Sequence, residues 1–492
     1  MKLELNALAV RMAGIAAIAG TAAAMANAAD QRAERQGRVA AADGTPLQGR
    51  LELVWGDGRP GPNRTSKLFA TLIDDDGRAH PLDAVSAKRA AGDLRRLDNR
   101  RVAIALSSSR SANADGLLTP EVIVPIDDLT AGGGSASKAG DISTLAAVSG
   151  QTSWVTVMCK FKDVAAEPKP KSYFTNMYAN TSGRLDHYWR QVSHGKMNLA
   201  GSAAFGWYTL PQPLSYYKNP SNGYLKLQLI QDDCLAAANP SVDYTGYYGI
   251  NMVFNQDVDG YAYGDLKSIT LDGATRRWGI TWNAPWAYMY LPNANSGIST
   301  LTHEMGHAYD LSHSDNTDGD DDTYDNPWDL MSGGWTETAL DSNYGLLPQH
   351  PIGHQRDQLG WVAAARLRKH LYTTPTTTYT LDRASFQAST NVLLIKLMVP
   401  GGSDYYTVEA RKKSGGIYES ELPGDAVIIH AVRGGYASIV DARTPPHTYS
   451  NQESNMFKAG ESWTTPEPAG KRFKIEVLAA TQSGFTVRVS SL

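Results

Sequence analysis

The sequence predicts an α+β central region with a mixed sheet, between a β-rich N-terminal domain and a C-terminal β-sandwich. Three observations support this fold class. The chain has 492 residues, which is too many for a single hydrophobic core. Short runs rich in Val, Ile and aromatic residues recur near both ends and are typical of strands. Between them, His303 and His307 stand four residues apart, the spacing of one helix face.

Residues 1–28 have the features of a secretory signal peptide. Lys2 and Arg11 flank the start of an apolar run from Met12 to Met25, and small residues follow it up to Ala28. We expect cleavage after Ala28. The run is too short for a membrane span, and no later run reaches about 18 apolar residues. The sequence therefore predicts a secreted protein, extracellular or periplasmic, without a membrane span.

Residues 29–130 predict a small β-rich domain. Its expected strands are 51–55, 68–73, 102–106 and 122–124, separated by Gly, Pro and Asp clusters. Residues 131–147 are rich in Gly and Ser and indicate a linker. The domain before this linker could be a propeptide that is removed or an accessory domain that stays attached. It contains no Cys, so it cannot silence a metal ion through a thiolate.

The central region, residues 148–369, is expected to begin with a strand at 153–158. A helix over 184–192 follows, and its aromatic residues Tyr188 and Trp189 are expected in the core. Residues 250–254 fit a central strand. A further strand is expected at 286–291, at an edge where an extended peptide could pair through its backbone. The helix after it would be capped by Asn295 or Ser296.

That helix carries a metal-ligand pattern. His303 and His307 can present two imidazoles to one cation, with Glu304 beside it. His313 is the natural third ligand if the chain turns back after His307. Asp310 would be the hinge, because Asp tolerates the left-handed conformation that a helix end often needs. Zinc takes neutral imidazole, and a catalytic zinc keeps three protein ligands and one position open for water. We therefore predict zinc ligands at His303, His307 and His313.

These residues resemble the metzincin zinc endopeptidases, whose pattern is His-Glu-x-x-His-x-x-Gly-x-x-His followed by a methionine turn. Met331, in the stretch Asn-Pro-Trp-Asp-Leu-Met-Ser, looks like that turn. Asp310 stands where the family usually has Gly. Gly333 stands two residues after Met331, where some metzincins carry Tyr, so we assign no tyrosine to the transition state.

Wider features resemble the secreted immune-inhibitor-A-like and gametolysin-like branches of this clan. They lie in the stretches 185–196, 206–211, 357–361 and 405–409. Immune inhibitor A often has Asp as its third ligand, whereas this chain offers His313, as gametolysin-like members do. The resemblance implies a metzincin-like catalytic domain, with a zinc-binding helix beside a mixed sheet, in a secreted metalloprotease with protein or peptide substrates.

The predicted reaction is hydrolysis of internal peptide bonds. Zinc would lower the pKa of its water and polarise the scissile carbonyl. Glu304 would accept the proton of the attacking water and pass it to the leaving amine. Met331 would form an apolar floor beneath the metal.

Two rival interpretations remain open. An aminopeptidase would use a downstream Glu as third ligand in place of His313, and Glu337 is the nearest candidate. An exported adhesin or glycan-binding protein would carry a structural zinc with a closed coordination shell. In that case Glu304 would have no chemical role.

Composition sets further limits. A net charge of −4 gives no reason to expect a nucleic-acid partner. Cys159 and Cys234 are too few for a disulfide scaffold, but in an oxidising compartment they could form one bridge. We expect the bridge, and the alternative is two separate buried thiols. The sequence does not indicate an oligomeric state.

After His313 the chain becomes acidic, with Asp315, Asp318, Asp320, Asp321, Asp322 and Asp325. Such a stretch suits either calcium or a solvated loop, and its spacing does not match an EF-hand. Residues 370–492 then predict the C-terminal β-sandwich, with strands at 392–397, 405–409, 426–430 and 485–489. Substrate docking, glycan binding and structural support all remain open as its role.

Overall fold

The computed structural model describes residues 46–492, with gaps at 62–63, 92–93, 99, 107–115, 127–146, 221–222, 293, 319–321, 334–336, 401–402, 443–452 and 469. The expected signal peptide and nearly all of the expected linker lie outside these residues. The chain divides into two compact units. Unit 1 comprises Met1–Leu53, Leu68–Ile142 and Glu467–Ala469, and unit 2 comprises Val54–Lys67, Ser143–Pro466 and Gly470–Leu492.

Unit 1 is a small β-rich unit with one covering helix. Its strands are the first part of β1 (Leu47–Gly58), β2 (Ser66–Asp74), β3 (Ala79–Leu82), β4 (Arg101–Leu106) and β5 (Pro120–Pro125). Apolar side chains of these strands and of α2 (Ala84–Ala91) form one core, which includes Leu51, Leu72 and Ile104. The four runs predicted as strands between residues 29 and 130 lie in β1, β2, β4 and β5.

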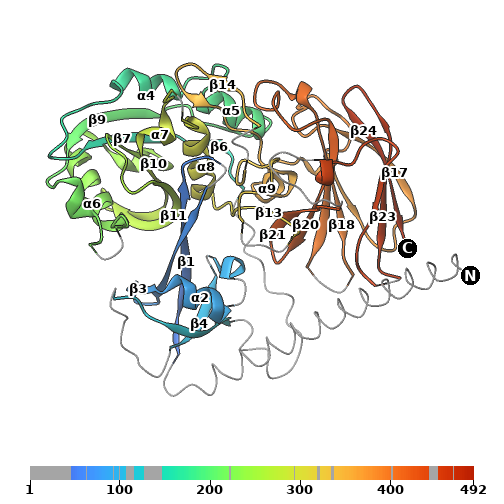
Figure 1. Cartoon of the computed structure of the whole chain (residues 1–492), viewed down its shortest axis with the longest axis horizontal. Helices are drawn as coiled ribbons and strands as arrows, with labels where there is room; N and C mark the ends of the chain where they lie inside the picture. Colours follow the sequence, from blue (N-terminus) through green and yellow to red (C-terminus); the bar gives the residue numbers. More distant parts are fainter. Residues whose placement is uncertain are drawn as a thin grey trace, which may run out of the picture. The chain divides into compact units, whose positions relative to one another are not determined.

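The central sheet of unit 2 is mixed. Its order is the end of β1, then β11 (Tyr261–Leu271), β12 (Ala274–Asn283), β10 (Gly249–Phe254), β7 (Trp154–Lys160) and β9 (Ala203–Thr209) (Figure 1). The last four strands run parallel, and β11 runs antiparallel to β12. All residues of β10 are buried, as expected for a continuous apolar run in a parallel strand. Residues Trp55 to Gly58 of β1 pair antiparallel with β11.

Helices pack around this sheet. They are α4 (Lys171–Met177), α5 (Leu185–Val192), α6 (Leu227–Ala238), α7 (Pro285–Tyr288), α8 (Ile298–Ala308) and α9 (Gly353–Gln358). Tyr188 and Trp189 are fully buried in one core with Leu301 and Met305 of α8, as the sequence predicted. Among the described residues, none of the helices is long and apolar enough to cross a membrane.

The structure corrects the prediction for residues 286–291. Residues from Pro285 form the short helix α7, because proline at a first helical position favours a helix start. The strand beside α8 is β11 instead, and it pairs with β1 on one side and with β12 on the other. The predicted caps are also wrong, because Gly297 is the N-cap of α8. Ser296 accepts a hydrogen bond from the backbone N–H of Leu291 and does not cap the helix.

Two sheets form the C-terminal part of unit 2. One consists of β16 (Leu367–His370), β18 (Leu394–Met398), β19 (Tyr405–Arg411), β20 (Ala426–Arg433), β21 (Tyr436–Ile439) and β13 (Asp315–Asn316). The other consists of β17 (Thr377–Asp382), β24 (Gly484–Ser491), β23 (Phe473–Ala480) and β22 (Ser462–Thr464). Residues of both sheets share one core, which includes Val408, Ile429 and Val487. The four predicted C-terminal runs lie at β18, β19, β20 and β24.

Short strand pairs complete the described part of unit 2. They are β6 (Gly150–Gln151) with β8 (Met197–Asn198), and β14 (Leu340–Asp341) with β15 (Gly345–Leu346). The first strand of the larger C-terminal sheet, β13, comes directly after the predicted ligand His313 and pairs parallel with β21. The chain therefore passes from the loop that carries His313 directly into the C-terminal sheet.

The expected disulfide is present, between Cys159 at the end of β7 and Cys234 in α6. It closes a loop with a sequence separation of 75 residues. We predict that the double variant Cys159→Ser with Cys234→Ser lowers the free energy of unfolding by about 2–4 kcal/mol, because the unfolded chain regains loop-closure entropy. Denaturant titration of the oxidised wild type and the variant measures this difference. Equal midpoints would contradict it.

Candidate metal centre

Helix α8 places His303 and His307 one turn apart on the same face, with both side chains buried. The helix packs against β11 so closely that Gly264 could not carry a Cβ, which would collide with the carbonyl of Glu304. Gly306, within the motif, is required in the same way. A Cβ there would collide with the sulfur of Met331. Met331 is fully buried and lies against the helix as the predicted floor.

The chain turns back after α8 at Asp310. This residue has φ of 68°, the left-handed conformation that the sequence predicted for the hinge. The backbone N–H of Asp310 donates to the carbonyl of His307, and that of Leu311 donates to the carbonyl of Gly306. These bonds satisfy helix-end carbonyls and bring His313 back to the helix.

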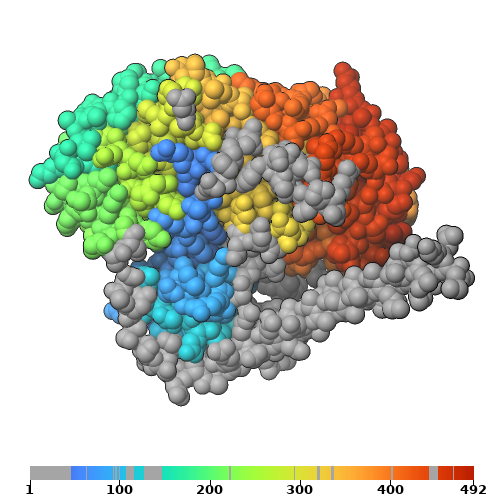
Figure 2. All heavy atoms as spheres, viewed as in Figure 1, coloured from blue at the N-terminus to red at the C-terminus, as the bar shows by residue number. Residues whose placement is uncertain are grey.

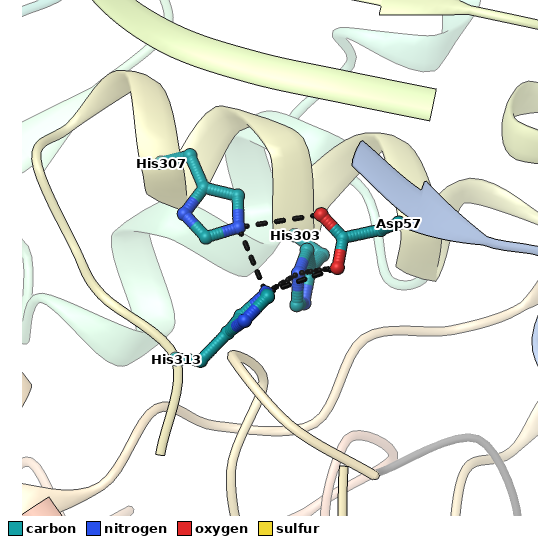
Figure 3. Close-up of side chains that lie close together, drawn as sticks. All are labelled: Asp57, His303, His307 and His313. Carbon is teal, nitrogen blue, oxygen red and sulfur yellow. Dashed lines mark hydrogen bonds and ion pairs between the residues drawn. The ribbon is translucent and has the colours of Figure 1, made fainter. Parts of the chain in front are cut away.

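The three predicted histidines meet (Figure 3). His313 Nε2 lies 3.2 Å from His303 Nε2 and 3.1 Å from His307 Nε2. His303 donates from Nδ1 to the carbonyl of Leu330, and His307 donates from Nδ1 to the carbonyl of Leu311, at 2.7 and 2.8 Å. Protons held on Nδ1 leave the Nε2 lone pairs of these two rings directed at the common point. Carbonyl groups that orient ligand histidines in this way are typical of metal centres.

A fourth side chain joins them, and the sequence did not predict it. Asp57, near the end of β1, lies 2.9 Å from His313 Nε2 and 3.4 Å from both His303 Nε2 and His307 Nε2. Asp57 is completely buried. The expectation of an open fourth position is therefore wrong for this form of the chain, because a carboxylate from the N-terminal segment occupies it.

The four residues fit a tetrahedral metal ion. Among the described residues they are the one group of His, Cys, Asp or Glu side chains close enough to share an ion, and all four are buried. Donor separations of 2.9–3.4 Å correspond to a central ion about 2 Å from each donor. Three imidazoles and a carboxylate at this distance suit zinc.

Two residues surround Asp57 on its other side. The hydroxyl of Tyr324 donates to Asp57 Oδ1, and the guanidinium of Arg64 lies 3.7 Å from the same oxygen. Arg64 also stacks on the ring of Tyr324, 4.0 Å from its centroid. Burial alone would raise the pKa of Asp57, but the neighbouring rings of His313 and His303 hold this pKa well below its usual value. The carboxylate is therefore charged and available as a ligand.

Glu304 is buried beside the same group. Within the described part of the chain, neither of its carboxylate oxygens has a hydrogen-bond partner. Burial raises the pKa of Glu304 well above its usual value, and the charge of Asp57 raises it further. A buried carboxylate without a structural partner next to a metal centre is a candidate proton acceptor.

A small pocket adjoins His303. Its lining includes Leu330 and Ser332 of the loop around Met331, together with Thr300 and Gln349. The hydroxyl of Thr300 and both side-chain amide atoms of Gln349 are buried and have no hydrogen-bond partner among the residues that the structure describes. Unpaired buried polar groups cost free energy, so this pocket favours a ligand that offers both a donor and an acceptor.

The acidic stretch after His313 is partly described. Asn316 donates its backbone N–H to Asp325 Oδ1 at 2.7 Å. Burial raises the pKa of Asp325 to about 8, and the nearby Asp315 and Asp322 contribute to this rise. Asp320 and Asp321 lie outside the described residues. Calcium binding therefore remains a hypothesis. Glu337, the alternative third ligand, does not belong to the metal group.

Comparison of the chain with known protein families and with curated proteins gave no match. The structure therefore supports a candidate metal-binding protein. One buried Asp and three buried His side chains could hold the ion.

We predict that the purified chain binds about one metal ion per molecule at this centre. His303→Ala should lose the bound metal, and chelation of the wild type should lower the melting temperature by roughly 5 °C or more. Elemental analysis and thermal unfolding measure both effects. His80→Ala, a change at a partly exposed histidine of unit 1, is the control. Metal content that is unchanged in His303→Ala would contradict the assignment.

Proposed function

We propose that this chain is the precursor of a secreted, zinc-dependent endopeptidase. The observation that carries the proposal is the unpartnered carboxylate of Glu304 beside three histidines whose nitrogens converge on one point. A purely structural metal centre has no use for such a carboxylate, which is costly to bury without a partner. The metzincin resemblance of the same residues supports a protease over other metal-dependent hydrolases.

The roles of the residues follow from their positions. A zinc ion held by His303, His307 and His313 would lower the pKa of a water molecule and polarise the scissile carbonyl. Glu304 takes one proton as the water oxygen bonds to the carbonyl carbon. It then gives that proton to the amine nitrogen as the carbon–nitrogen bond breaks. Met331 keeps the floor of the site apolar.

Tyr324 is a candidate for stabilising the developing negative charge. Its hydroxyl donates to the Asp57 oxygen that lies beside the histidine nitrogens. If Asp57 leaves, the hydroxyl faces the position of an oxygen in the reacting group, where a donor stabilises charge that develops in the transition state. Tyr324 would thus supply the tyrosine contact to the transition state that we could not assign at the position of Gly333.

Strand β11, which would become an edge if β1 left it, suggests how a substrate is held. Its residues Tyr261 to Gly264 pair with an extended segment in antiparallel register. A substrate chain that replaced that segment could pair in the same way along β11, next to α8. Pairing of this kind recognises the extended backbone over several residues and does not require a free N-terminus. It therefore supports an endopeptidase over an aminopeptidase.

A second candidate function is a binding protein with a structural zinc. The four-ligand shell, closed by Asp57, favours it, since structural zinc centres are closed and catalytic ones keep an open position. The two candidates differ in what they predict for Glu304 and for Asp57. A structural centre needs all four ligands at all times, whereas a protease needs Asp57 to leave.

We predict that Glu304→Gln lowers hydrolysis of an unfolded protein substrate by roughly 10²–10⁴-fold and leaves metal content unchanged, because the amide cannot accept the proton. Each chain is first treated by limited proteolysis with an added protease, which is then inhibited, so that Glu304→Gln does not depend on processing itself. Product peptides are then identified by mass spectrometry. Hydrolysis at the wild-type rate would contradict the role of Glu304. Trimming from N-termini alone would instead support an aminopeptidase.

We predict a preference for a polar, uncharged residue next to the cleaved bond, because Gln349 and Thr300 lack partners in the pocket beside His303. Gln349→Met should shift the preference toward apolar residues by about tenfold in kcat/KM. A peptide library with mass-spectrometric detection measures the change, and Gln151→Met, at an exposed position, is the control. An unchanged cleavage profile would show that this pocket does not select the substrate.

A further inference from the structure

We propose that the segment Val54–Lys67 is a removable inhibitor built into the chain, which holds the centre closed with Asp57 as the fourth metal ligand. This inference rests on the proposed function and names how the same centre is regulated. It draws on the backbone of the segment, on its carboxylate and on its basic side chains.

The backbone of the segment occupies the place of a substrate. Trp55, Asp57 and Gly58 pair with Gly264, Ala262 and Tyr261 of β11, so the segment is an added strand at the edge next to α8 (Figure 1). Gly56 is required there, because a Cβ would collide with the ring of Tyr263. The segment therefore fits this edge closely and leaves its backbone groups unavailable to another peptide.

The carboxylate of Asp57 occupies the place of the attacking water. Its two oxygens face the nitrogens of His303, His307 and His313 (Figure 3), and Trp55 of the same segment packs against the ring of His313. A carboxylate oxygen is an ordinary zinc ligand, so it would complete a tetrahedral shell with the three imidazoles. With that shell complete, no position remains for water.

Arg64 holds this arrangement in place. It donates from Nε to the carbonyl of Gly58 and from Nη1 to the carbonyl of Ser332, next to Met331. Its guanidinium also pairs with Asp57, and both groups are nearly or completely buried. Asp57 and Glu304 put two carboxylates in one buried space, and the positive charge of Arg64 offsets their repulsion.

The outer part of the segment is basic and lies against acidic side chains. Arg59 pairs with Asp257 at 3.2 Å, and Lys67 pairs with Asp259 at 3.4 Å. Lys67 also lies 3.7 Å from the ring centroid of Tyr261, a residue of the edge strand. In Figure 2 the blue atoms of Val54–Lys67 lie among the green and yellow atoms of unit 2, to which this segment belongs. The Arg59–Asp257 pair is exposed and contributes little free energy, whereas the Lys67–Asp259 pair is largely buried.

The segment belongs to unit 2, but it is joined to the rest of the chain only through unit 1. Its ends continue into Leu53 and Leu68, which both belong to unit 1. A single cut after unit 1 would therefore detach unit 1 and the segment together. The linker that the sequence predicts at 131–147 has a composition suited to such a cut.

The test compares the zinc-loaded full-length wild type with Asp57→Ala, Asp57→Asn and Arg64→Ala. The first measurement is calorimetric binding of a small hydroxamate, which needs an accessible metal but no catalysis. The second is hydrolysis of an unfolded protein before and after limited proteolysis. Asp76→Ala, at an exposed acidic residue of unit 1, is the control.

We expect both Asp57 variants to bind the hydroxamate and to hydrolyse protein about tenfold or more faster than the unprocessed wild type. Arg64→Ala should show a smaller gain in the same direction. Processed wild type should match the Asp57 variants and begin between residues 127 and 150. Asp57→Asn keeps the shape of the side chain and serves if Asp57→Ala does not fold.

The two proposals fail in different ways. If the unprocessed wild type binds hydroxamate and hydrolyses protein as well as the Asp57 variants do, the inhibitory role is wrong and the protease remains. If the Asp57 variants bind hydroxamate but no form hydrolyses protein, the inhibitory contact stands and the protease is wrong. If all Asp57 variants lose the metal, Asp57 is a structural ligand and the inhibitor is ruled out.

Discussion

The turn at Asp310 is the constraint on which the metal centre depends. Without it, α8 would continue and His313 would point away from His303 and His307. The left-handed residue frees the carbonyl of Leu311 to accept the Nδ1 proton of His307, so one turn places the third ring and also orients the second. Ring orientation matters as much as position, because only a lone pair directed at the ion makes a ligand.

The C-terminal sheets support this centre directly. Arg411 of β19 donates to the carbonyl of Trp328 at 2.8 Å, and Asn326 donates to His430 of β20 at 3.1 Å. Both contacts fasten the loop that carries Met331. Asp329 in that loop accepts from Ser314, the residue after His313. Support of the methionine loop is thus a role of the C-terminal region that its own strand pattern could not reveal, since the contacts join residues far apart in sequence.

Local signals carried most of the correct predictions. His303, Glu304, His307 and the hinge at Asp310 lie within one helix and its end, where spacing determines geometry. Asp57 gave no such signal, because it reaches the centre through strand pairing with β11, and register across a sheet is not written in a short stretch of sequence. The strand expected at 286–291 failed for a related reason: its apolar run suits a buried helix as well as a strand, and Pro285 decides between them.

The absence of Cys from residues 29–130 seemed to remove a route to inhibition, because a thiolate is a strong zinc ligand. Under the inhibitory role that we propose for Asp57, an anionic ligand on a strand of the right register provides this route. Like a thiolate, the carboxylate of Asp57 brings a negative charge close to Glu304, and the two negative charges repel each other. Arg64 and Tyr324 meet that charge with an ion pair and a hydrogen bond. Arg64 pairs with Asp57, and the ring of Tyr324 also packs against that of His313. A permanent fourth ligand could come from residues 143–466 of unit 2, whereas Asp57 lies on a strand that continues into unit 1 at Leu53. Under the inhibitory role that we propose, these contacts hold Asp57 at the ion until the segment Val54–Lys67 is removed.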